Sequence, residues 1–131
     1  MDTTRFTAGL EKRRAVLGDA YVDRAVGAAD SFTRPFQELV TTYCWGAIWG
    51  EGSALDDRQR SLNNLCILAA MGRWDELELH LRGALRNGCS IDEIRETLMQ
   101  IAVYAGIPTG VSAFKLARRV LAEEGVEIPP D

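Results

Sequence analysis

The spacing of apolar residues constrains the fold of this chain more than any other feature. In nearly every segment apolar side chains return every three or four positions, and no strand-like alternation is sustained. Glycine-containing breaks separate the segments at Gly18, Gly50, Gly72, Gly88 and Gly106. A chain of 131 residues with 47% hydrophobic residues is long enough for one core. We therefore predict an all-α, single-domain helical bundle over residues 1–131, with about six to seven helices and a frayed tail at 126–131.

Local signals predict where the helices begin and end. Ser90 and Glu93 have the spacing of a capping box, and Asn87-Gly88 is typical of a left-handed helix end. The helix that ends at Met71 is apolar around most of its circumference in its second half, so we expect it to be central and buried. The expected helices cover residues 5–17, 21–29, 36–49, 56 or 57 to 71, 74–87, 90–104 and 109–124.

Composition excludes several classes of protein. The net charge of -4 argues against a nucleic-acid-binding surface. We expect the Arg13-Arg14 and Arg118-Arg119 pairs to be solvated helix faces. No apolar run approaches the roughly 20 residues that span a membrane, and no apolar signal region follows the N-terminus. Three cysteines without a C-x-x-C spacing and one histidine make a zinc site improbable. We expect a cytoplasmic protein with reduced thiols and no metal.

The only histidine of the chain, His80, stands one helical turn after Glu76. At this i, i+4 spacing the carboxylate and the imidazole share one helix face, which points toward the interior in line with Gly83. Two interpretations follow from the residues alone. The pair is either satisfied at a contact between helices, or the carboxylate orients the imidazole for proton transfer.

Three polar residues, Arg60, Asn63 and Asn64, interrupt the apolar central helix. A buried polar group without a hydrogen bond costs about 1–3 kcal/mol, so these side chains need partners. Hydrogen bonds to other helices are one solution, and a ligand is the other. A guanidinium suits a carboxylate ligand because its planar fork binds two oxygens.

Aromatic residues gather in two places. Trp45 and Trp49 form one ridge at i, i+4, which is more typical of a core or a subunit interface than of a pocket wall. Cys44 has no neighbour in the sequence that would lower the pKa of its thiol, so we expect it to be inert. Tyr104 precedes the Gly106-Ile107-Pro108 break, which matches no phosphate-binding pattern.

Several of these segments occur together, in the same order, in the carboxymuconolactone decarboxylase family, and the chain resembles its short bacterial branch from about Arg5 to Leu121. The segments are 13–19, 45–46 with 48–49, 60–62, 76–77 with 80–82, 87–88, and 104 with 106–108. The resemblance implies an all-α homo-oligomer, a trimer or hexamer. A sister branch of thiol reductases carries C-x-x-C-x-x-x-H. Here Arg73 and Glu76 occupy its two cysteine positions, which excludes disulfide exchange.

The resemblance also implies a reaction, the decarboxylation of 4-carboxymuconolactone to the enol-lactone in aromatic-compound degradation. Loss of carbon dioxide leaves electrons that enter the lactone carbonyl as a dienolate, so neither a metal nor an organic cofactor is needed. We assign His80, with a pKa near neutrality, as proton carrier, Glu76 as its orienting partner and Arg60 as the clamp for a second carboxylate. The other expected substrate contacts are Asn63, Asn64, Trp45, Tyr43 and Tyr104.

Two departures from the decarboxylase branch bear on the substrate. Tyr43-Cys44 stands where that branch has a histidine, and Asn63-Asn64 replaces mostly apolar residues. These changes favour an alternative, an isomerase or decarboxylase of another lactone or β-keto acid in a biosynthetic pathway. A second alternative is a non-catalytic oligomeric binding protein on the same fold.

Overall fold

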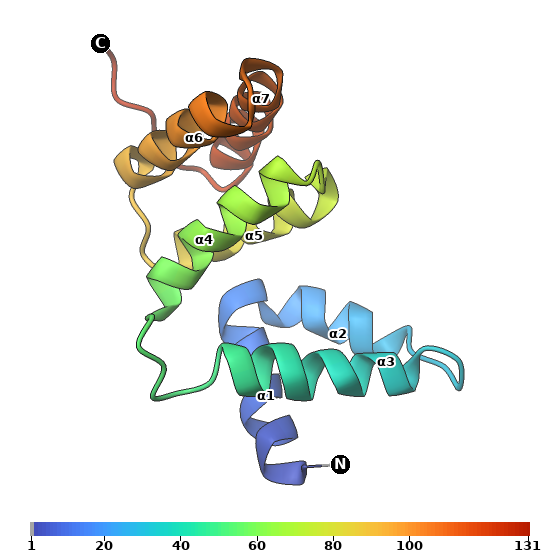
Figure 1. The fold of residues 1–131 in the computed structure, drawn as a ribbon. Helices are drawn as coiled ribbons and strands as arrows, with labels where there is room; N and C mark the ends of the chain where they lie inside the picture. Colours follow the sequence, from blue (N-terminus) through green and yellow to red (C-terminus); the bar gives the residue numbers. More distant parts are fainter. Residues whose placement is uncertain (1) are drawn as a thin grey trace. The chain divides into compact units, whose positions relative to one another are not determined.

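The computed structural model describes residues 2–131, which are helical and contain no strand (Figure 1). Its elements are α1 (Thr3–Leu17), α2 (Asp19–Gly27), α3 (Arg34–Leu39), η1 (Val40–Ile48), α4 (Asp57–Ala70), α5 (Trp74–Arg86), α6 (Ile91–Ala105) and α7 (Ile107–Glu123). The predicted all-α class and number of helices are confirmed. Most predicted boundaries lie within two residues of the observed ones, apart from the continuous helix expected over 36–49.

The described chain divides into two compact units, one that ends at Asp57 and one that spans Arg58–Asp131. The first unit holds α1, α2, α3 and η1, and the second holds α4 to α7. The organisation of residues 1–131 as a single domain stays a prediction. No helix in residues 2–131 combines the length and the apolar character that a membrane span requires.

In the N-terminal unit α1 packs closely against η1. A glycine permits this approach, because a Cβ atom at Gly9 would collide with the backbone oxygen of Thr41. Trp45 and Trp49 are each 3% exposed, and their ring centroids lie 4.9 Å apart. The aromatic ridge therefore belongs to the core of this unit.

The segment η1 is a π-helix, in which the Trp49 amide donates to the carbonyl of Cys44 five residues earlier. The apolar residues of 36–49 predict an ordinary α-helix, and this prediction is wrong for η1. The buried side chains of this segment, Thr41, Trp45 and Trp49, recur every fourth residue, a spacing that a slightly widened helix places on one face.

The prediction of two solvated arginines at 13 and 14 is wrong for Arg13, whose side chain is only 4% exposed. Its Nη1 donates to Gln37 Oε1 at 3.0 Å and to Thr41 Oγ1 at 3.1 Å. Arg14 instead pairs with Asp23 at 2.8 Å and with Asp19 at 3.4 Å. Successive helical side chains point about 100° apart, so α3 and η1 can cover one arginine and leave its neighbour at the surface.

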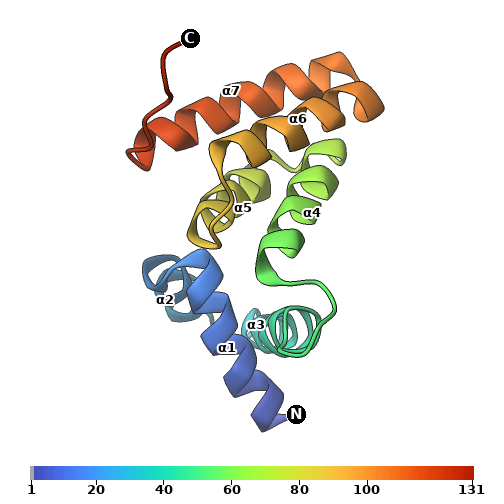
Figure 2. The ribbon, with the colours of Figure 1, turned by 90° about the vertical axis from the view of Figure 1, so that its left-hand side faces the viewer.

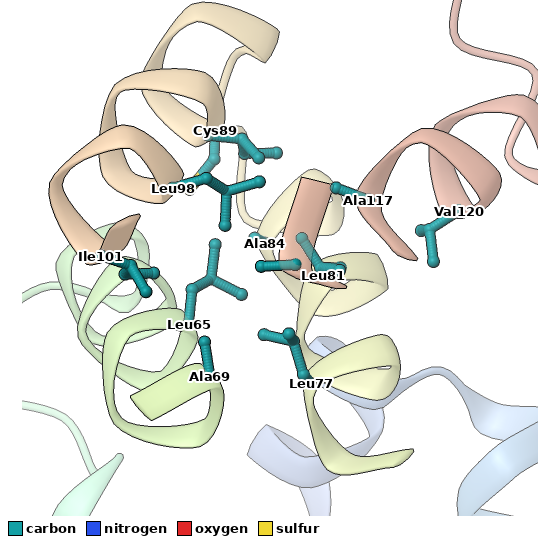
Figure 3. Close-up of a cluster of buried hydrophobic side chains, with 12 residues drawn as sticks. Leu65, Ala69, Leu77, Leu81, Ala84, Cys89, Leu98, Ile101, Ala117 and Val120 are labelled. Atoms are coloured by element: carbon teal, nitrogen blue, oxygen red, sulfur yellow. The ribbon is translucent and has the colours of Figure 1, made fainter. Parts of the chain in front are cut away.

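The C-terminal unit is built as two helical hairpins, α4 with α5 and α6 with α7 (Figure 2). All four helices contribute to one apolar core, which Figure 3 shows from close by. Its fully buried members include Leu65 of α4, Leu77 and Leu81 of α5, and Leu98 of α6. Figure 3 shows the side chains of Leu65, Leu81 and Leu98 directed toward one another.

The expectation that α4 is buried around most of its second half is wrong. Ser61, Leu65 and Ala69 form one fully buried face, whereas Ile67 is 53% exposed and Met71, just after the helix, is 67% exposed. The apolar composition of α4 therefore exceeds what the core of this unit covers.

The predicted helix ends are confirmed around residue 90. Ser90 Oγ accepts from the Glu93 amide and Glu93 Oε1 accepts from the Ser90 amide, both at 3.0 Å, so the capping box is complete. At the end of α5 the left-handed residue is Gly88, with φ of 86°. These features depend on residues only a few positions apart, which is why the sequence reveals them.

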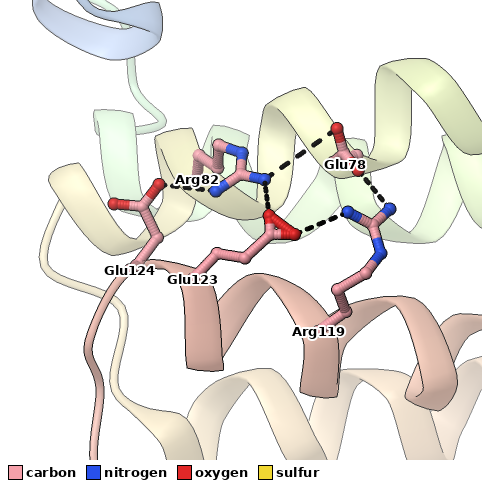
Figure 4. A network of polar contacts seen from close by, with 5 residues as sticks. All are labelled: Glu78, Arg82, Arg119, Glu123 and Glu124. Atoms are coloured by element: carbon pink, nitrogen blue, oxygen red, sulfur yellow. Dashed lines mark hydrogen bonds and ion pairs between the residues drawn. The ribbon is translucent and has the colours of Figure 1, made fainter.

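Five charged side chains connect α5 with α7 at the surface (Figure 4). Arg82 pairs with Glu124 at 2.7 Å and with Glu123 at 3.0 Å, while Arg119 pairs with Glu123 at 2.8 Å and with Glu78. The tail after Gly125 has no regular secondary structure. The side chain of Ile128 nevertheless lines a groove between α6 and α7, so the tail does not detach completely from the unit.

Candidate active site

Helix α5 positions Glu76 and His80. Its apolar face, with Leu77, Leu81 and Ala84, packs into the core of the C-terminal unit. His80 lies beside this face and is half-buried, and Glu76 lies one turn earlier. The fold therefore sets the imidazole at the margin of the core. The expectation that the Glu76 carboxylate also points toward the interior is wrong, because its side chain is 44% exposed.

Helix α4 brings Asn64 to His80. The Asn64 Nδ2 atom lies 3.4 Å from His80 Nδ1. Because an amide nitrogen donates, this contact favours the neutral tautomer that carries its hydrogen on Nε2. Asn64 thus engages one ring nitrogen and leaves Nε2 as the donor.

The pKa of His80 is lowered from 6.5 to about 4 because burial disfavours the charged imidazolium, although the negative charge of Glu76 acts in the opposite direction. This corrects our expectation of an imidazole with a pKa near neutrality. His80 is therefore neutral at pH 7 in the protein without a bound substrate.

Glu76 accepts a hydrogen bond from Arg73 Nη2 at 2.8 Å. This bond lowers the pKa of the Glu76 carboxyl, and the nearby His80 contributes in the same direction. The two positions that hold cysteines in the thiol-reductase branch are thus joined here by an ion pair. Glu76 acts on His80 through its negative charge, while its carboxylate is shared with Arg73.

The other predicted residues of α4 differ in exposure. Arg60 is half-buried and lies one turn before Asn64, so both occupy one stripe of the helix. Asn63 is exposed, and the assumption that its amide is buried is wrong. Adjacent helical residues point in different directions, so only one of the two asparagines faces α5.

The predicted aromatic residues are scattered. Tyr104 of α6 is 85% exposed and lines a cavity of about 170 Å³ together with Cys66, Gln100 and Ile101. Tyr43, which is 63% exposed, and the buried Trp45 belong to the N-terminal unit. The structure therefore brings together Glu76, His80 and Asn64 within the C-terminal unit.

The thiols are poorly suited to nucleophilic chemistry. Burial raises the pKa of the Cys44 thiol, although Arg13 partly offsets this effect, and burial also raises the pKa of Cys66. Cys89 is buried. Among residues 2–131 no three histidine, cysteine or acidic side chains come together as metal ligands would.

The sequence model of the carboxymuconolactone decarboxylase family matches residues 34–119 of this chain. The chain belongs to this family. It is 41% identical to the nitrosuccinic acid decarboxylase NpaB of Metarhizium robertsii over 116 residues, which cover 88% of this chain and 80% of that protein. It is 35% identical to the 4-carboxymuconolactone decarboxylase of Acinetobacter baylyi over 125 residues, which cover 95% and 92%.

A shorter match, 48% identical over 42 residues, links this member of the carboxymuconolactone decarboxylase family to a 4-carboxymuconolactone decarboxylase of Pseudomonas putida. It covers 32% of this chain and 88% of that sequence. The resemblance inferred from the sequence is confirmed. The names of these relatives support a decarboxylase of this family, and they differ in substrate.

Proposed function

We propose that this protein decarboxylates a small dicarboxylic acid at His80, with 4-carboxymuconolactone or a close unsaturated carboxy-lactone as the substrate. The observation that carries the proposal is the half-buried imidazole of His80, which contacts Asn64 and feels the charge of Glu76, in a chain similar to two proteins that are named decarboxylases.

The reaction breaks the bond between the leaving carboxylate and its carbon. Carbon dioxide departs, and the electron pair moves through the conjugated system to the lactone carbonyl as a dienolate. That carbon system then takes one proton, so each turnover consumes one proton and releases one carbon dioxide. The substrate accepts the electrons itself, which is why we propose a reaction without a metal or an organic cofactor.

In the proposed mechanism His80 supplies the proton. The free protein holds the imidazole neutral at pH 7, but a bound dianionic substrate favours the imidazolium, because opposite charges nearby stabilise the charged form. His80 then takes up a proton as the substrate binds and transfers it to carbon after carbon dioxide leaves. Asn64 holds the neutral ring through Nδ1, and once Nδ1 carries the proton the Asn64 amide turns its oxygen toward it to accept. Glu76 limits the effect of burial on the pKa.

Arg60 is the proposed clamp for the carboxylate that does not leave. It lies one turn from Asn64, and its planar fork can bind both oxygens of a carboxylate. Arg60→Lys keeps the charge but loses this geometry, so we expect KM to rise more than kcat falls. An unchanged KM in a folded Arg60→Lys protein would remove Arg60 from the site.

Nitrosuccinic acid is a second candidate substrate, and the 41% identity to the fungal decarboxylase favours it. It also has two carboxylates, and its nitro group can accept the electrons as a nitronate. The polar side chain of Asn64, unusual for the lactone-specific branch, is consistent with a more polar acceptor group than a lactone. The same roles of His80 and Arg60 serve either substrate.

We also propose that the protein is a homo-oligomer, a trimer or hexamer. The structure supports this with large apolar side chains left exposed in one protomer, including Val103 at 76%, Tyr104 at 85% and Ile107 at 65%. Light scattering coupled to size-exclusion chromatography measures the subunit number directly, and a monomer at micromolar concentration would contradict this part of the proposal.

The direct test supplies each acid to purified protein in the presence of a strong chelator and without added cofactor. Carbon dioxide and product are then measured together. We expect turnover of 4-carboxymuconolactone, and faster turnover of nitrosuccinic acid would select the second candidate. Release of carbon dioxide from neither acid would overturn the proposal.

A further inference from the structure

Arg13 is the one charged side chain that is buried among residues 2–131. Its Nη1 donates to the amide oxygen of Gln37 and to the hydroxyl of Thr41, and its side chain also bonds to Tyr21. Each of these partners is an uncharged amide, hydroxyl or phenol. The guanidinium is therefore surrounded by polar groups that form hydrogen bonds with it but carry no negative charge.

Three other cations of the same unit each pair with a carboxylate. Lys12 pairs with Asp57 at 2.8 Å and Arg14 pairs with Asp23 at 2.8 Å, and Arg5 lies 3.8 Å from Asp2. The groups that act electrostatically on Arg13 are the phenol of Tyr21 and the thiol of Cys44, and burial keeps that thiol protonated. Arg13 is thus more buried than these three cations, yet its partners among the described residues include no carboxylate.

Burial lowers the pKa of Arg13, yet a guanidinium stays charged in proteins. A buried charge without an opposite charge is strongly unfavourable. Within the described residues the Arg13 Nε atom is also buried without a hydrogen-bond partner. Both the missing charge and the unmet donor belong to the same side chain.

We propose that Arg13 binds a small carboxylate from solution inside the N-terminal unit. A carboxylate supplies the missing negative charge and can accept from Nε–H together with a neighbouring Nη–H, because the guanidinium fork and the carboxylate are both planar. Gln37 and Thr41 hold the opposite side of the guanidinium and fix its orientation. This inference does not rest on decarboxylation at His80.

The test measures the thermal midpoint of the protein in succinate and in sodium chloride at equal ionic strength. A ligand that binds only the folded state raises the midpoint, by about 5 °C at tenfold excess over its dissociation constant for a chain of this size. In an Arg60→Met background, which removes the proposed clamp for dicarboxylates at the active site, we expect this rise in succinate and not in chloride, and we expect the added Arg13→Met to abolish it. Arg14→Met is the matched control and should keep it. An equal response to both salts, or a full response in Arg13→Met, would overturn the proposal.

Gln37→Glu keeps the test decisive even if Arg13→Met does not fold. It places a carboxylate on the side chain that already bonds to Arg13 at 3.0 Å. We expect this variant to be at least as stable as the wild type and to lose the response to succinate, because the charge is now supplied internally. A Gln37→Glu protein that responds like the wild type would contradict the proposal.

His80→Ala separates this site from the proposed active site. The succinate response should persist in His80→Ala if the anion binds at Arg13, whatever happens to turnover. Loss of the response in His80→Ala, with Arg13 intact, would place the binding at His80 and overturn the assignment to Arg13.

Discussion

The two units of the molecule bury an ionisable group in different ways. In the C-terminal unit His80 loses its charge on burial, because its pKa is lowered to about 4. In the N-terminal unit Arg13 is almost completely buried, at 4% exposed, and keeps its charge among neutral partners. A histidine can meet the cost of burial by releasing a proton, whereas a guanidinium needs an anion.

The remaining charges follow the same contrast. The C-terminal unit places two arginines and three glutamates in a surface network between α5 and α7 and keeps an apolar core (Figures 3 and 4). The core of the N-terminal unit combines the Trp45–Trp49 pair with Arg13 and Thr41. Buried polarity without a local counter-charge therefore marks the places where a ligand would be stabilising.

Replacement of His80 should have the largest effect on activity. His80→Ala removes the proposed proton carrier, so we expect turnover to fall by roughly 10²–10⁴-fold in a protein that remains folded. Glu76→Gln should lose less, because the imidazole remains. Glu78→Gln on the outer face of α5 should keep normal turnover and serves as the control. A folded His80→Ala enzyme with wild-type turnover would remove histidine from the mechanism.

Replacement of Leu65 should have the largest effect on stability. Leu65 is 0% exposed in the core of the C-terminal unit, so Leu65→Ala should lower the free energy of unfolding by about 2–5 kcal/mol. Ile67→Ala, on the same helix but 53% exposed, should cost well under half as much. Denaturant unfolding measures both, and equal losses would show that Ile67 is covered in the assembled protein.

These residues show what the sequence could predict. The capping box of Ser90 and the end at Gly88 are local and were predictable, as was the shared face of Glu76 and His80. The burial of Arg13 and the exposure of Asn63 were not. Helical spacing identifies a face, but it does not say which helix covers that face.

The π-helix and the lowered pKa of His80 could not be predicted from the sequence either. In a π-helix an amide bonds to the carbonyl five residues earlier instead of four, and apolar residues at every fourth position fit either kind of helix. The pKa depends on how much of the ring other segments cover. Both properties arise from packing between segments that are distant along the chain.

The lowered pKa of His80 predicts how stability depends on pH. Between pH 6.5 and about 4 the unfolded chain binds a proton at this residue and the folded protein does not. Stability is therefore lost as the pH falls through this range, by at most about 3 kcal/mol. The difference between the wild type and His80→Gln in the free energy of unfolding should change across this window, and a constant difference would contradict the burial of the imidazole.

The smallest effect should come from the surface network. Glu78→Gln removes one carboxylate that pairs with Arg119, and exposed ion pairs contribute about 0.2–1 kcal/mol each. We expect a loss in this range by denaturant unfolding, reduced further in high salt. A loss above about 2 kcal/mol would mean that the α5–α7 network carries part of the stability assigned here to the apolar core.

The most direct test of the account is an NMR titration of His80, which is the only histidine of the chain. Histidine-selective labelling gives the NMR signals of a single imidazole ring. Its pKa can therefore be measured without resonance assignment. The account predicts a value of about 4 in the free protein and a higher value when a non-reactive dicarboxylate is bound. A free-protein pKa near 6.5, unchanged by the dicarboxylate, would contradict the claim that burial keeps His80 neutral until the substrate supplies its charge.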